Sequence, residues 1–237
     1  GKGLRAKSGD KVVCKILSYP KHKSPEGIIK KVLGRQFEKK SELKSILYNY
    51  HLSETYPEKA IKELENADDV IKKSNIKLRK DFRNELTFTI DGIDARDFDD
   101  AVSLKKEGEN YILGVHIADV SEFVKYMSAL DSEALNRATS VYFPEQVIPM
   151  LPEKLCNDLC SLKEGVDRLT LSCVMQIDAN GKVIGSEITP SIIKSAKRFT
   201  YDEVQAIIEG DKKAIAKNER FVDTIILMYK LSKILFD

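Results

Sequence analysis

The 237-residue sequence predicts an α+β protein in which helices pack on a mixed β-sheet, preceded by a two-stranded segment and a helical linker. Beyond residue 85, short runs rich in Val, Ile, Thr and aromatic residues alternate with amphipathic helical patterns. Before it, two strand patterns are followed by two helical ones. In the second part we expect strands at 86–90, 101–104, 111–118, 170–177 and 183–189, and helices at 128–137, 201–209 and 212–236.

The first two expected strands are Lys11–Leu17 and Gly27–Leu33, joined by a basic loop between two prolines. Two strands cannot bury a core alone. Either they join the main sheet, or they are the end of a small β-barrel whose other strands lie outside this chain. The opening without an initiator Met favours the second alternative.

Two amphipathic helices are expected next, at Lys39–Tyr50 and Pro57–Lys73. Proline is well suited to the first turn of the second helix, with Thr55 before it as a candidate cap. These helices read as a connector. We therefore divide the chain into the end of a barrel module (1–35), a helical linker (36–84) and an incomplete main domain (85–237).

Composition excludes several protein classes. With 42% hydrophobic and 32% charged residues, the chain is neither disordered nor fibrous. Its apolar runs are far below the roughly 18 residues of a membrane span, and no secretory signal is present. Four cysteines are too few for a disulfide framework, so we expect free thiols and a cytoplasmic location.

The net charge of +2 conceals an asymmetry. Residues 1–85 carry 21 basic and 12 acidic side chains, whereas residues 86–237 carry 18 basic and 25 acidic ones. The basic part could attract a polyanion and the acidic part could hold cations. A Lys-rich solvated surface is an equally good interpretation of the basic part, so charge alone does not decide between them.

Five aspartates lie within residues 91–100, directly after an expected strand. Crowded carboxylates raise one another's pKa unless they share a cation. Oxygen ligands without His or Cys favour Mg²⁺, with Mn²⁺ as a substitute, and Mg²⁺ on carboxylates is typical of phosphoryl transfer. A calcium EF-hand is excluded because Val102 stands where that loop requires Gly. The remaining alternative is a solvated acidic turn.

Further along, the segments GVHIADVS (114–121), TSVYFPEQVIPMLP (139–152), LCSL (159–162) and DRL (167–169) occur in order. Together with the aspartate segment they resemble the ribonuclease II / ribonuclease R family of 3′→5′ exoribonucleases. The likeness is closer to ribonuclease R and extends from about Leu86 to Gln205. The first strands and the linker resemble, less specifically, the end of the family's second OB-like cold-shock module and the linker that follows it.

The resemblance implies a processive, sequence-independent hydrolase of single-stranded RNA that releases nucleoside 5′-monophosphates. The family's four active-site aspartates, which bind up to two Mg²⁺ ions, fall on Asp91, Asp97, Asp99 and Asp100, while Asp94 falls at a variable position. Asp99 matches the residue that the family treats as essential to cleavage. The family also implies a monomer without membrane association.

Three further residues are candidates for RNA binding. Tyr142 matches the family tyrosine that packs against the 3′-terminal nucleotides, although core packing is the ordinary role of a Tyr between two apolar residues. Arg96 and Arg168 could contact phosphate or neutralise the aspartates. We assign no chemistry to His116, because a His on an apolar strand is usually structural.

The sequence also departs from the family. Nothing in it matches the later Ser-Pro-Ile-Arg-Arg-Tyr-like segment, whose Arg contacts the scissile phosphate. We therefore expect an internal fragment that is weakly active or inactive alone. The alternative functions are a noncatalytic RNA-binding clamp with a vestigial aspartate cluster, and a structural metal-binding module.

Overall fold

The computed structural model describes residues 6–65, 76–144 and 146–236, and divides the chain into two compact units. The first unit comprises the chain up to Tyr56 together with Val141–Ile148. The second comprises Pro57–Ser140 and Pro149–Asp237. Each unit is described separately below.

The first unit contains the predicted pair of strands, β1 (Asp10–Ser18) and β2 (Glu26–Arg35), which form an antiparallel sheet of their own. The strands therefore do not join the main sheet. Helix α1 (Lys39–Asn49) follows as predicted, and an ion pair between Lys11 and Glu42 links it to β1. A separate short hairpin, absent from our prediction, is formed by β7 (Val141–Tyr142) and β8 (Val147–Ile148).

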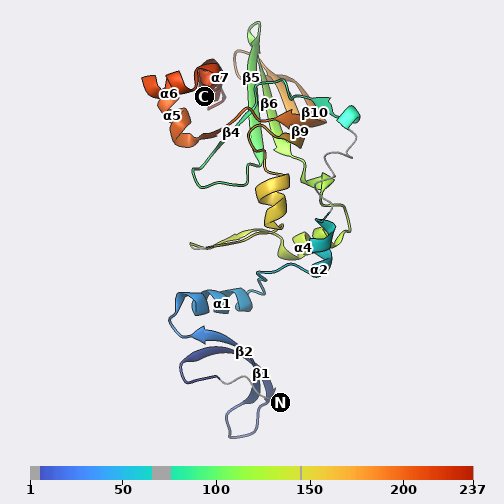
Figure 1. The fold of residues 1–237 in the computed structure, drawn as a ribbon, viewed down its shortest axis with the longest axis vertical. Helices are drawn as coiled ribbons and strands as arrows, with labels where there is room; N and C mark the ends of the chain where they lie inside the picture. Colours follow the sequence, from blue (N-terminus) through green and yellow to red (C-terminus); the bar gives the residue numbers. More distant parts are fainter. Residues whose placement is uncertain (1–5, 66–75, 145, 237) are drawn as a thin grey trace. The chain divides into compact units, whose positions relative to one another are not determined.

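The second unit is built on a seven-stranded sheet with the order β11-β4-β5-β6-β9-β10-β3 (Figure 1). Its four central pairings are antiparallel, whereas the edge strands β11 and β3 pair in parallel, which confirms the predicted mixed sheet. All five predicted strands are present, and two short strands were missed. The strands are β3 (Lys80–Asp81), β4 (Phe88–Asp91), β5 (Asp100–Glu107), β6 (Asn110–Ala118), β9 (Asp167–Ile177), β10 (Val183–Lys194) and β11 (Lys197–Thr200).

The helices largely follow the sequence pattern. One prediction was wrong: residues 212–236 form two helices, because Asn218 leaves the helical conformation and its side-chain amide donates to the Ala214 carbonyl. Of the helix predicted at 57–73, the structure shows residues 58–63 as helical and 64–65 as a turn, and the remainder lies outside the described residues. No helix in the described ranges is long and apolar enough to cross a bilayer. The helices are α2 (Glu58–Glu63), η1 (Ile76–Leu78), η2 (Val120–Glu122), α4 (Ala129–Arg137), the π-helical turn η3 (Leu155–Leu159), α5 (Tyr201–Ile208), α6 (Lys212–Lys217) and α7 (Glu219–Phe236).

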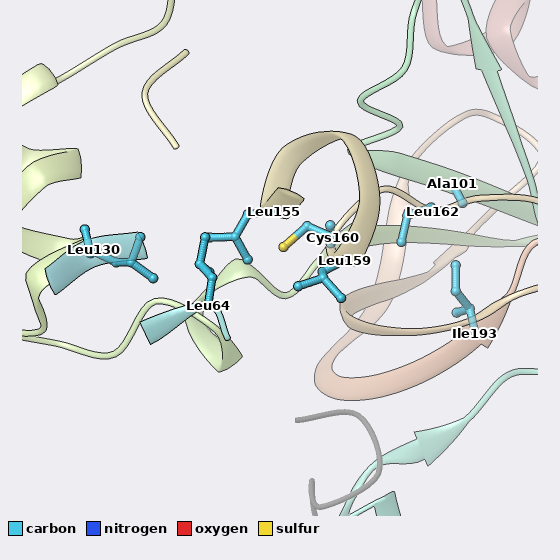
Figure 2. Packing of buried hydrophobic residues seen from close by; sticks show 10 residues of the cluster. Leu64, Ala101, Leu130, Leu155, Leu159, Cys160, Leu162 and Ile193 are labelled. Atoms are coloured by element: carbon cyan, nitrogen blue, oxygen red, sulfur yellow. The ribbon is translucent and has the colours of Figure 1, made fainter. Parts of the chain in front are cut away.

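Both faces of the sheet are packed, because side chains alternate along each strand. Helices α5 and α7 cover one face around Phe88, Phe199 and Leu104 (Figure 1). On the other face the turn η3 inserts Leu155 between the helices α2 and α4 and the sheet (Figure 2). The π-helical turn is therefore packed on both sides, and the segment that follows it forms hydrogen bonds with the backbone of Arg96 and Phe98, ahead of β5.

His116 has a structural role, as the sequence predicts. Its side chain lies within the sheet, 1% exposed, with Nε2 3.1 Å from the Ser103 hydroxyl and Nδ1 2.6 Å from the Ser172 hydroxyl. Gly114 leaves room for this arrangement, since a Cβ there would lie 2.4 Å from Ser103 Oγ. Burial lowers the pKa of His116 to about 4.

This burial predicts an acid sensitivity of the fold. Because the unfolded chain protonates His116 near pH 6.5, its contribution to stability is complete above that pH and is lost as the pH falls toward 4. We expect the free energy of unfolding to drop by about 2 kcal/mol from this residue between pH 7 and pH 5. Urea unfolding of His116→Asn should show a flatter pH dependence, whereas the exposed His51→Asn should keep the original slope. Equal slopes in the two variants would contradict the prediction.

Candidate active site

The predicted aspartates lie on the acidic loop, residues 92–99, and on the two strand ends that flank it. Asp91 is the last residue of β4 and Asp100 is the first residue of β5, while Asp97 and Asp99 lie on the loop between them. Because these strands pair in antiparallel fashion, the last residue of β4 and the first residue of β5 lie at the same end of the strands. The fold therefore brings the two ends of the aspartate segment together at that end of the sheet.

Two hydrogen bonds from Ser161 hold the acidic loop. Its hydroxyl donates to the Arg96 carbonyl at 2.8 Å and accepts from the Phe98 amide at 3.1 Å, so it binds the backbone on both sides of Asp97. Ser161 is fully buried and lies two residues after the η3 turn, which ends at Leu159. The Asp99 carbonyl in turn accepts from the Ala118 amide at 2.9 Å. The loop backbone is thus fixed independently of any ligand.

The carboxylates of this segment influence one another's ionisation. Loss of hydration raises the pKa of Asp91 and the nearby Thr89 side chain opposes the rise; the negative charges of Asp100 and Asp97 add to it, whereas Arg198 opposes it. Loss of hydration also raises the pKa of Asp99, with added repulsion from the other three carboxylates. Such coupled carboxylates are stabilised as anions when a cation binds between them.

The chemistry of these residues fits a hard divalent cation. Asp91 Oδ2 is buried and has no hydrogen-bond partner, and carboxylate oxygens are the ligands that Mg²⁺ and Mn²⁺ prefer. Within the described residues, no group of three or more His, Cys, Asp or Glu side chains is arranged to hold a metal ion. Convergence of the four carboxylates on an ion therefore stays a prediction.

The three predicted RNA-binding residues have different surroundings. Tyr142 lies on β7 in the first unit and is 70% exposed, which disfavours the core-packing alternative. Arg96 is exposed on the acidic loop. Arg168 is buried, and its guanidinium donates to the backbone carbonyls of Ser161 at 2.8 Å and Asp158 at 3.0 Å. These bonds favour a structural role for Arg168 over phosphate contact.

The predicted free thiols are confirmed for all four cysteines. Two of them border the site. Burial raises the pKa of Cys156, with a further contribution from Asp97, and burial raises the pKa of Cys160 to about 12. Both thiols therefore stay protonated at neutral pH.

Sequence reasoning missed Arg198, which approaches the site from β11. Its Nη2 donates to the carbonyls of Gly92 and, at 3.0 Å, Ile93, the first residues of the acidic loop. In the register of β11 with β4, Thr200 lies beside Asp91. The exposed Tyr201, the first residue of α5, therefore follows at the same end of the strands. No local signal could have found Arg198, because its contacts span more than 100 residues.

Comparison with known protein families identifies the family to which the chain belongs. The family profile described as "RNB domain" matches residues 79–236, and the profile described as "Cold shock domain" matches residues 1–57. The chain belongs to the RNB domain family. The RNB match begins at the first strands of the seven-stranded sheet and includes the whole acidic loop.

Individual proteins similar to this RNB-domain chain support the same family relationship. Ribonuclease R of Thermotoga maritima is 45% identical over 97% of the chain, and Ribonuclease R 1 of Lactococcus lactis is 42% identical over 93%. The chain spans 33% and 27% of these relatives, respectively. Among solved structures, Mycoplasma genitalium RNase R in complex with double-stranded RNA matches 97% of the chain and 41% of its own length, with a TM-score of 0.82 and 25% identity. The predicted resemblance to ribonuclease R is thereby confirmed.

One structural relative shares the fold alone. Yeast Ssd1, described as a pseudonuclease, matches 86% of the chain and 26% of its own length, with a TM-score of 0.66 and 22% identity. A fold does not by itself imply an activity, because function depends on the residues of the site. The activity of an RNB domain must therefore be argued from its own acidic loop.

Proposed function

We propose that the protein is a processive, sequence-independent 3′→5′ exoribonuclease that hydrolyses single-stranded RNA to nucleoside 5′-monophosphates with Mg²⁺. The observation that carries the proposal is the aspartate segment 91–100, whose Asp91, Asp97, Asp99 and Asp100 stand where the resemblance predicts the active-site aspartates, on a backbone held by buried hydrogen bonds. The ribonuclease R relatives support the same activity. We also propose a cytoplasmic monomer without membrane association, divided near residues 35 and 84.

In this proposal Asp91, Asp97, Asp99 and Asp100 hold up to two Mg²⁺ ions, for which Mn²⁺ can substitute. When bound, the metal lowers the pKa of an attacking water and stabilises charge on the leaving 3′ oxygen. Ser161 fixes the backbone on both sides of Asp97, so the carboxylates need little reorganisation when the cation and the terminal phosphate arrive.

Contacts with RNA are proposed for Tyr142 and Arg96, with Arg168 as a weaker candidate. An exposed Tyr can stack on any base, and such stacking is worth roughly 1–3 kcal/mol, which suits an enzyme without sequence preference. Arg96 stands exposed on the acidic loop, where a phosphate could reach it. The excess of basic residues before residue 86 supports binding of a polyanion.

A noncatalytic RNA-binding clamp is the second candidate, and the pseudonuclease Ssd1 is the observation that favours it. In that case the aspartate cluster would be vestigial. The retention of all four family aspartates in this chain favours the enzyme.

Incubating the chain with 3′-tailed single-stranded RNA and Mg²⁺ tests the proposal. Since the chain spans 33% of the length of the Thermotoga ribonuclease R, we expect it to release nucleoside 5′-monophosphates orders of magnitude more slowly than that enzyme. EDTA should stop it.

The other outcomes separate the alternatives. RNA binding with a steep salt dependence but no Mg²⁺-dependent release would favour the clamp. Absence of both binding and release would contradict both RNA-directed functions. Release as fast as that of the complete relative would contradict the weak activity expected of this chain.

A further inference from the structure

Unpartnered buried polar atoms are concentrated at one place in the fold. Of the four such side-chain atoms in the described part of the chain, three are Thr89 Oγ1, Asp91 Oδ2 and Arg198 Nε. The parallel register of β4 and β11 pairs Arg198 with Thr89, and Asp91 lies two residues further along the same strand face. A buried polar group without a hydrogen-bond partner destabilises the fold, so the clustering of these atoms calls for an explanation.

The guanidinium of Arg198 is directed at the backbone of the acidic loop rather than at a carboxylate. Its Nη2 binds the Gly92 and Ile93 carbonyls, and its carbon Cζ lies 5.5 Å from the centre of the Phe98 ring. Phe98 stands between Asp97 and Asp99 in the sequence. Arg198 therefore forms hydrogen bonds with the first two residues of the loop and a cation–π contact with Phe98 near the end of the loop.

Arg198 and Asp91 are close enough to affect each other's charge, yet they form no ion pair within the described ranges. Such a pair would be the ordinary arrangement for two partly buried groups of opposite charge. It would also occupy the carboxylate oxygen that a cation needs. In the described part of the chain, Asp91 Oδ2 is instead left without an ion-pair partner.

We propose that Arg198 is a positioning residue for the acidic loop: it fixes the backbone that carries the carboxylates, and so improves cation binding despite its own positive charge. The cation part of this inference rests on the proposed function. The contact with the loop backbone does not.

Whether cation binding becomes stronger or weaker when Arg198 is replaced distinguishes a positioning role from simple neutralisation of the aspartates. If Arg198 only neutralised the aspartates, removing its charge would strengthen binding of a divalent cation, because like charges repel. Positioning predicts the opposite result. It also predicts that Lys, which keeps the charge but lacks the planar fork, replaces Arg poorly.

Mn²⁺ binding to the whole chain, measured by electron paramagnetic resonance, provides the test. We expect the Kd of Mn²⁺ to rise roughly tenfold in Arg198→Met and by a smaller factor in Arg198→Lys, in line with the loss of two positioning hydrogen bonds. The matched control is Arg220→Met, since Arg220 also lies over a Phe ring, at 5.8 Å, and forms no hydrogen bond or ion pair with residues 92–99 in the described part of the chain. Unchanged or tighter binding in Arg198→Met would overturn the inference.

Amide hydrogen exchange of residues 92–99, measured without metal, supplies the second readout. We expect exchange in Arg198→Met to be roughly ten times faster in this loop than in the original chain, with no change in Arg220→Met. Unchanged exchange would overturn the positioning role. If the original chain bound no Mn²⁺, the proposed metal chemistry would fail, and loop exchange alone would decide the role of Arg198. Arg198→Lys serves for both measurements if the Met variant does not fold.

Discussion

Replacing Asp99 with Asn should reduce RNA hydrolysis roughly a thousandfold or more in any form of the protein that releases nucleotides. The amide has nearly the shape of the carboxylate but lacks its charge, so it binds Mg²⁺ far less well. RNA affinity should be retained or slightly increased, because the substitution removes a negative charge near the phosphate backbone. Release of mononucleotides and fluorescence anisotropy with labelled RNA measure the two effects separately.

Asp94→Asn is the matched control for this prediction. It removes one charge from the same loop, at an exposed position that the resemblance predicts to be outside the set of active-site aspartates. If Asp94→Asn were as damaging as Asp99→Asn, the total negative charge of the loop would matter, rather than a specific ligand. If Asp99→Asn lost RNA affinity in proportion to turnover, its role would be in binding rather than in catalysis.

The sequence predicts the second unit well where a pattern is long enough to show a period. Strands such as β9 and β10 run for 11 and 12 residues, and their runs of β-branched and apolar residues predicted most of each strand, at 170–177 and 183–189. Strands β3 and β11 were missed because two and four residues carry no period. Both are held at the edges by parallel partners that lie about 110 residues away along the chain.

The residues of the candidate site also differ in how far the sequence predicts them. The aspartates could be predicted because they are crowded into ten residues, and crowding is a local property. Ser161 and Arg198 could not be assigned a role, because their contacts with the loop join residues 63 to 106 positions apart. Ligands gathered on one loop can be found in a sequence, whereas the residues that hold the loop come from elsewhere in the fold.

Phe88→Ala should cause the largest loss of stability. Phe88 is completely buried on β4, and its ring meets Phe199 at 5.4 Å and Phe221 at 5.8 Å, both edge to face. Removing a buried Phe costs about 3–5 kcal/mol, a large part of the roughly 5–15 kcal/mol that stabilises a typical domain. We expect the Tm of the second unit to fall by roughly 10 °C or more.

Phe236→Ala is the control, because this Phe, on the long helix α7, is 90% exposed. Its removal should change the free energy of unfolding by less than about 0.5 kcal/mol in urea unfolding followed by far-UV circular dichroism. Since the chain has no Trp, far-UV circular dichroism follows its unfolding better than intrinsic fluorescence does.

Phe88 joins β4 to β11 and α7, so its removal also weakens the support of the strand that ends at Asp91. A loss no larger than that of the control would mean that the three rings do not form the core that aligns this strand.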